Sequence, residues 1–197
     1  GFGFPEKVDT HGTTIPYRRF SATDDRYSAA YLNRHLRGKE LPIMSEALSQ
    51  RFKNSILEIF VNAAMHSDSK LGIFACGQYF PRKNRLDFCV ADAGLGIRRK
   101  IYRELGLKMN SDKAIDWALQ EGNTTRKGSV PGGLGLKLIQ EFIAMNEGRI
   151  QIVSDRGYWE FSPRGETLTR IDTSFPGTVI NIEINTADTG SYRLRAE

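Results

Sequence analysis

Ten consecutive residues in the first third of the chain, ILEIFVNAAM (56–65), contain only two polar side chains, Glu58 and Asn62. On a helix, residues four apart project from the same face, one turn above the other. The other faces of this segment are apolar, and a helix that is apolar all round is buried. Burying an unpaired polar side chain costs roughly 2–7 kcal/mol, and burying a charge costs more. The segment therefore predicts a buried helix whose Glu58 and Asn62 face a cleft that holds a ligand, a metal ion or ordered water.

The hydrophobic periodicity of the rest of the chain predicts a mixture of helices and strands around that segment. Helices are expected over 24–37, 43–66, 98–105, 112–120 and 133–146, with Ser111 as the N-cap of the fourth. Strands are expected over 13–20, 71–80, 86–91, 150–154, 158–161 and 178–185, and a loop over 163–174. This order predicts an α+β two-layer sandwich, in which helices pack on one face of a mixed, mostly antiparallel sheet.

The composition is that of an ordinary globular chain, with 197 residues of which 40% are hydrophobic and 26% charged. This length suggests one domain, with or without a small appendage. No apolar run approaches the roughly 20 residues of a membrane-spanning helix. Cys76 and Cys89 fall in apolar runs, where we expect small core residues and a reduced, cytoplasmic setting. The three histidines are too scattered along the chain for a zinc site.

Two glycine-rich turns supply candidate ligand contacts. The first, DAGLGI (92–97), ends a predicted strand, and its glycines permit a close backbone approach while Asp92 can accept a hydrogen bond from an amino group. The second, GGLGL (132–136), opens a helix whose free N–H groups and dipole favour an anion. Either turn alone is equally compatible with a purely structural connection. No Walker A sequence is present, and Arg99 and Leu138 stand where a dinucleotide fingerprint needs its third glycine.

In this order along one chain, the polar pair and the two turns resemble the GHKL superfamily of ATPases and kinases. EIFVNAAMH (58–66) is similar to its N-box, DAGLGI to its first glycine box, and NTTRKGSVPGGLGL (123–136) to the end of its ATP lid with the second glycine box. The resemblance covers about 43–185 and implies the Bergerat ATP-binding fold. It divides the chain into an N-terminal extension of unknown role (1–42), an ATP-binding domain (43–187) and a C-terminal tail (188–197).

The resemblance implies a role for each matching residue. Glu58 would be the general base, Asn62 would hold a Mg²⁺ ion that bridges the ATP phosphates, and Asp92 would bind the adenine amino group. The other implied nucleotide-binding residues are Gly94, Gly96 and Ile97 at the adenine, Thr125, Arg126 and Lys127 in the lid over the γ-phosphate, and Gly132, Gly133, Leu134 and Gly135 at the phosphates.

Several functions remain open at this point. The pattern of Glu58, Asn62, Ala63 and His66 is similar to the ATPase and anti-sigma-factor serine kinase branches, so we expect a domain that hydrolyses Mg-ATP or transfers its γ-phosphate. A nucleotide-gated interaction module, with a mobile lid at about 121–132 and little turnover, is the alternative. A basic nucleic-acid-binding domain is the minor alternative, because the net charge is only +5. The expected partners are ATP and a protein partner or phosphate acceptor, and a homodimer is left open.

Overall fold

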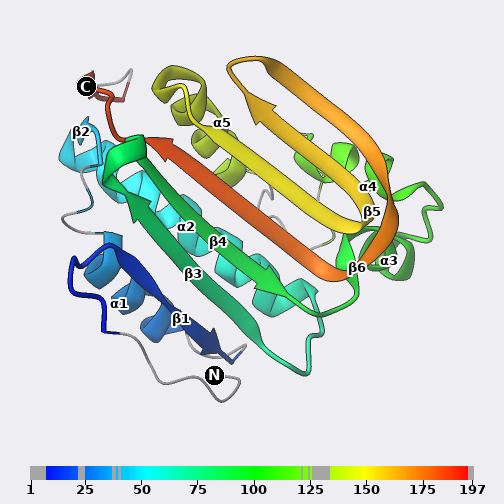
Figure 1. The fold of residues 1–197 in the computed structure, drawn as a ribbon. Coiled ribbons are helices and arrows are strands. Elements are labelled where there is room, and N and C mark those ends of the chain that lie inside the picture. The colour runs from blue at the N-terminus through cyan, green and yellow to red at the C-terminus, as the bar shows by residue number, and fades with distance from the viewer. Residues whose placement is uncertain are drawn as a thin grey trace.

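Five α-helices and a five-stranded sheet make up most of the described chain. Figure 1 shows how they are arranged. The computed structural model describes residues 8–21, 25–36, 39, 41–120, 122–123, 125 and 134–194. The elements are β1 (Thr14–Phe20), α1 (Asp25–Leu36), β2 (Ile43–Met44), α2 (Glu46–His66), β3 (Ile73–Phe80), the 3₁₀ helix η1 (Pro81–Lys83), β4 (Arg85–Asp92), α3 (Gly96–Leu105), α4 (Ser111–Leu119), α5 (Leu134–Asn146), β5 (Arg149–Ser162), β6 (Gly165–Asn185) and β7 (Ser191–Tyr192).

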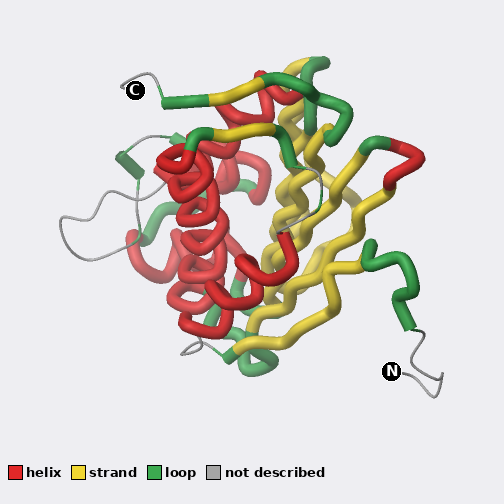
Figure 2. The backbone as a smooth tube through the Cα atoms, turned by 90° about the vertical axis from the view of Figure 1, so that its left-hand side faces the viewer, coloured by secondary structure: helices red, strands yellow, loops and turns green. Residues whose placement is uncertain are grey.

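The sheet has the strand order β1-β3-β4-β6-β5, and each neighbouring pair is antiparallel. The α-helices lie on one side of this sheet, so the molecule has two layers (Figure 2). The predicted two-layer α+β architecture is therefore confirmed. Parallel pairing occurs outside the main sheet, between the two-residue strands β2 and β7.

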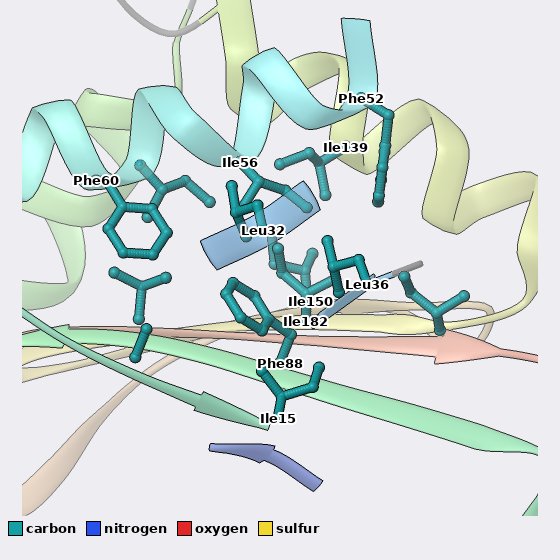
Figure 3. Packing of buried hydrophobic residues seen from close by; sticks show 14 of the residues in the cluster. Ile15, Leu32, Leu36, Phe52, Ile56, Phe60, Phe88, Ile139, Ile150 and Ile182 are labelled. Carbon is teal, nitrogen blue, oxygen red and sulfur yellow. The ribbon is translucent and has the colours of Figure 1, made fainter. Parts of the chain in front are cut away.

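The core lies between α2 and the inner face of the sheet (Figure 3). Phe52, Ile56 and Phe60 project from α2 toward Phe88 and Ile182 of the sheet, and each of these five side chains is buried. Burial of one such side chain contributes about 1.5–3 kcal/mol. The helix is not buried all round as expected, because Met65 on its other side is 57% exposed. The α2 helix is thus amphipathic, with one face toward the sheet.

The start of α2 differs from the prediction by three residues. Ile43 and Met44 were expected in the helix, but they pair with Ser191 and Tyr192 as a short strand. Ser45 is the N-cap, and its side-chain oxygen accepts a hydrogen bond from the Leu48 N–H at 3.2 Å. A capping hydroxyl satisfies an N–H group that has no partner inside the helix, so the helix begins after Ser45.

The predicted loop over 163–174 is wrong. Residues 165–185 form one long strand, β6, which pairs with β5 along most of its length. The predicted break in β5 between 154 and 158 is not a gap but a pair of register shifts around Asp155, whose φ is +52°. Trp159 of β5 is fully buried, and its Nε1–H donates to Glu166 at 2.6 Å. This pairing with the neighbouring strand holds the polar outer half of the hairpin in strand form.

The N-terminal segment contributes to the same layers. Strand β1 pairs with β3 at the sheet edge, and Leu32 and Leu36 of α1 belong to the core cluster. The two cysteines, by contrast, are not core residues as expected: Cys76 is exposed and Cys89 is half-buried. Within the described ranges, no helix is both long enough and apolar enough to cross a bilayer.

Candidate functional site

A cavity of about 180 Å³ lies between α2 and the sheet, where β4 ends and the chain turns into α3. Its wall is mostly apolar with a few polar groups, which is typical of small-molecule sites. Its volume is below the roughly 300–1,000 Å³ of a site that encloses a whole drug-sized ligand, so it suits one ring system of a larger molecule. The described lining residues are Ile59, Asn62, Ala63, Ser67, Val90, Ala91, Asp92, Gly96, Ile97, Lys100, Thr125, Leu136, Ile152, Thr178 and Ile180.

Asp92 is the buried carboxylate of this cavity. It is the last residue of β4 and is 5% exposed. Burial raises the pKa of Asp92 to about 6, although the backbone N–H groups of Gly94 and Thr178 oppose this shift. The Gly94 N–H donates to Oδ1 at 2.9 Å. An ionised carboxylate accepts several hydrogen bonds, so Asp92 is suited to bind an amino group inside the cavity.

Gly94 lets the turn after β4 approach the end of α2. A Cβ atom at Gly94 would lie 1.9 Å from the carbonyl oxygen of Ser67, closer than any side chain permits. The next residue, Leu95, donates its N–H to that same oxygen at 2.7 Å. Gly94 does not line the cavity itself. Its function in the described structure is to fix the turn against α2.

Ser154 holds the first turn of α3 in place, and sequence reasoning missed it. The Ile97 N–H donates to Ser154 Oγ at 2.9 Å, and the Ser154 hydroxyl donates to the Gly177 carbonyl at 3.0 Å. Gly96 has a φ of +73°, and a Cβ atom there would lie 2.9 Å from the same hydroxyl. The alternation of Ile150, Ile152 and Ser154 was a usable signal, because it places a hydroxyl on the buried face of a strand.

The structure brings five of the predicted ligand-binding residues to one cavity: Asn62, Asp92, Gly96, Ile97 and Thr125. They come from α2, β4, α3 and the segment before α5, so the cavity depends on the whole fold. Asn62 lines it together with Ile59 and Ala63 of the same helix. The prediction that the N-box-like helix and the first glycine turn share a ligand site is consistent with this arrangement.

Glu58 does not line that cavity. It lines a second, more open cavity of about 450 Å³ between α2 and α5, together with Arg51, Asn54, Ser55, Lys137, Leu138 and Glu141. Glu58 is one helical turn from Asn62, a rise of about 6 Å along the helix axis. The two polar residues that share a face in the sequence pattern therefore line two adjacent cavities.

Helix α3 carries several cations next to the first glycine turn, and Lys100 of this helix lines the cavity. Its ammonium pairs with Glu104 at 3.1 Å, one turn along α3. Arg98 instead pairs with Asp155 at 2.8 Å, and Arg103 pairs with Asp68 and Glu104. Of Arg98, Lys100 and Arg103, Lys100 is therefore the one that lines the cavity and is placed to meet an anionic part of a ligand.

Four predicted site residues lie outside the described residues: Arg126, Lys127, Gly132 and Gly133. Leu134 and Gly135 are the first residues of α5, and Leu136 lines the cavity. The start of α5 therefore borders the cavity, and the anion site expected at the second glycine turn stays a prediction. Ser111, by contrast, is not the N-cap of α4. Asn110 has that position, and the Ser111 hydroxyl donates to Asp155 at 2.9 Å.

The described residues do not form a metal site by themselves, because no group of three or more His, Cys, Asp or Glu side chains gathers within them. Magnesium at phosphate sites is usually held by one or two protein oxygens, with phosphates and water as its other ligands. Asn62 lines the cavity, and one amide side chain could make that limited contribution.

Comparison with known proteins does not assign the chain to a family. No protein-family model matches the chain. No curated protein matches it significantly.

Proposed function

We propose that the chain binds Mg-ATP, with the adenine in the cavity at the end of β4. The buried Asp92 carboxylate carries this proposal. It lies in a mostly apolar cavity with the Asn62 amide, beneath a turn that is fixed by Gly94. A buried acceptor among apolar side chains suits a flat heterocycle with an exocyclic amino group, which is the chemistry of adenine. The order of motifs that resembles the GHKL superfamily supports the same reading.

The triphosphate would leave the cavity toward α2 and the start of α5. Asn62 would hold the magnesium ion, which supplies charge neutralisation at the phosphates when it is bound. Lys100 lines the same cavity and adds a cation, and the N-terminal N–H groups of α5 favour an anion. The lid residues Thr125, Arg126 and Lys127 would cover the γ-phosphate, and Gly132 and Gly133 would present N–H groups to it.

The proposed reaction is hydrolysis of ATP or transfer of its γ-phosphate, with Glu58 as the general base. A carboxylate one turn from a magnesium ligand is suitably located to take a proton from water or an acceptor hydroxyl. The second cavity, which Glu58 lines, is large enough for such an acceptor. A cytoplasmic location, where ATP is available, is part of this proposal.

One observation favours the alternative of a nucleotide-gated interaction module. Glu58 lines the cavity beside the nucleotide cavity, not the nucleotide cavity itself. If Glu58 does not reach the water or hydroxyl that attacks the γ-phosphate, turnover is slow or absent. In that case ATP would change a partner surface through the lid and α5 without being consumed quickly.

Titration calorimetry with Mg-ATP and Mg-GTP tests the binding proposal. We expect heat with ATP and much less with GTP, because guanine presents a carbonyl oxygen where adenine has its amino group. Asn62→Ala should weaken ATP binding in the presence of magnesium. Gln50→Ala is the matched control, because Gln50 is an exposed amide on the same helix that donates to Asn54 and lines neither cavity. Absence of heat with both nucleotides would overturn the proposal.

ATP labelled at the γ position separates the possible reactions. Label released as free phosphate indicates an ATPase, and label on the chain or on an added partner indicates a kinase. Tight binding with label that stays on ATP indicates the gated module.

A further inference from the structure

The two cysteines of the chain face each other across the sheet. Cys76 of β3 and Cys89 of β4 are direct partners in the antiparallel register. Neighbouring residues on both strands alternate in burial, with Ala75 and Phe88 buried on the helix side. Both cysteines therefore project from the face that the helices leave uncovered, which is the face toward the viewer in Figure 1. Both are free thiols, and Cys76 is exposed.

The register satisfies the main geometric requirement of a disulfide. Directly opposed residues of antiparallel strands have Cα atoms about 4.5–5.5 Å apart, and disulfides need about 4.4–6.8 Å. Their Cβ atoms, about 4.5–5.5 Å apart, must approach slightly to reach the roughly 3.5–4.5 Å of a disulfide. The backbone pairing is thus compatible with the bond, and an exposed disulfide at this position would be open to reduction by thiols.

The pKa values of the two thiols also favour thiol–disulfide exchange. A hydrogen bond from the Cys89 thiol lowers the pKa of Cys76 to about 6, whereas the same bond and burial raise the pKa of Cys89. The thiolate is the nucleophile in disulfide exchange. On its other side, Cys76 faces β1 where the register shifts between Ile15 and Arg18, so an irregular strand borders the exposed thiol.

We propose that Cys76 and Cys89 form a reversible redox modification site, which a small-molecule disulfide of the glutathione class oxidises to a cross-strand disulfide. The Cys76 thiolate attacks one sulfur of the reagent and releases one thiolate, which leaves a mixed disulfide on Cys76. Cys89 then loses its proton and attacks the Cys76 sulfur, which releases the second thiolate. The protein loses two electrons and two protons, and the reagent becomes two thiols.

The experiment incubates the full folded chain with oxidised glutathione, followed by alkylation and mass spectrometry. The chain has two cysteines, so no other thiol contributes to the signal. We expect a monomer that has lost two hydrogen atoms and accepts no alkyl group, and reduced glutathione should restore both thiols. Cys89→Ser should stop the reaction at the mixed disulfide on Cys76. In denaturing urea the second step should slow by about tenfold or more, because only the folded sheet holds the thiols together.

A matched variant tests the register itself. Cys76→Ser combined with Gln78→Cys keeps two thiols on the same face but makes them diagonal neighbours, about 7–8 Å apart between Cα atoms, beyond disulfide range. Circular dichroism checks that this variant folds, and it should accumulate mixed disulfides only. The proposal is overturned if the folded natural chain keeps two alkylatable thiols, if it forms only mixed disulfides or linked dimers, or if the diagonal pair oxidises equally fast.

Discussion

The Leu95 N–H donates a 2.7 Å hydrogen bond to the carbonyl oxygen of Ser67, which joins the turn after β4 to the residue that caps α2. The contact is possible because Gly94 has no side chain at the point where the two segments meet. Asn62 near the end of α2 and Asp92 at the end of β4 are consequently held in a fixed relation. The two ends of the proposed ligand site behave as one unit.

Gly94→Ala should lower the free energy of unfolding by at least 2 kcal/mol, because the new Cβ atom would overlap the Ser67 carbonyl and force the backbone to shift. Urea denaturation measures the change. Gly106→Ala is the control: its Cβ atom meets no neighbour within 4 Å, and the cost of its left-handed φ of 69° is about 1 kcal/mol. Equal losses in the two variants would contradict the tight contact at Gly94.

Asp92→Asn should stabilise the ligand-free protein at neutral and higher pH. Burial raises the pKa of Asp92 from 3.8 to about 6, so the folded protein favours the neutral carboxyl group. The stability that the neutral Asp92 carboxyl group contributes is present below pH 3.8. It declines between pH 3.8 and about 6, and it is lost above pH 6. The Asp92→Asn substitution should therefore raise the free energy of unfolding by nearly zero at pH 3.5 and by about 3 kcal/mol at pH 8. Unfolding experiments at both pH values measure it, and a pH-independent difference would exclude the raised pKa.

The same carboxylate should give nucleotide binding a pH dependence. If the ionised form accepts the adenine amino group as proposed, the affinity for Mg-ATP should fall roughly tenfold between pH 7 and pH 5, as Asp92 takes up a proton. In Asp92→Asn this dependence should disappear, and binding at pH 7 should be weaker by about 10- to 100-fold. Calorimetry across this range measures both effects. A variant that is more stable but binds Mg-ATP less tightly would indicate that the buried Asp92 carboxylate contributes to ligand binding and not to stability.

Glu58→Gln should leave the affinity for Mg-ATP unchanged and lower turnover by about 10²- to 10⁴-fold if Glu58 is the base. The comparison variant is Glu46→Gln, which removes the same charge from the exposed first turn of α2. Release of labelled phosphate under single-turnover conditions measures the step. Equal rates for Glu58→Gln and the natural chain would refute the base role and favour a water activated elsewhere.

Local sequence patterns were sufficient to predict the elements whose structure is determined by residues close together in the chain. The α2 segment, the hairpin of β3 and β4, and the turn at Asp92 were predicted because periodicity, turn residues and glycines act over a few neighbours. The convergence of Asn62, Asp92 and Thr125 on one cavity agrees with the motif order, although periodicity alone does not predict it.

The errors arose where a pairing partner, near or far along the chain, determines the structure. The polar residues after Pro163 read as a loop, yet pairing with β5 and the buried Trp159 hold them in β6. Ile43 and Met44 are removed from the helix by a partner strand near the C-terminus. Serine is a residue type that is preferred at N-caps, but the Ser111 hydroxyl donates a hydrogen bond to Asp155 instead. In each case a tertiary contact overrides the local preference.

The strand order has a consequence for how the chain comes to its native state during synthesis. Strand β4 is central, but its second neighbour, β6, is made some 70 residues later, after three helices and β5. Until then β4 offers a free edge rich in apolar residues, and such edges invite pairing with other chains. Thr178 and Ile180 also complete the cavity wall, so the cavity of a nascent chain stays open on that side until β6 has left the ribosome.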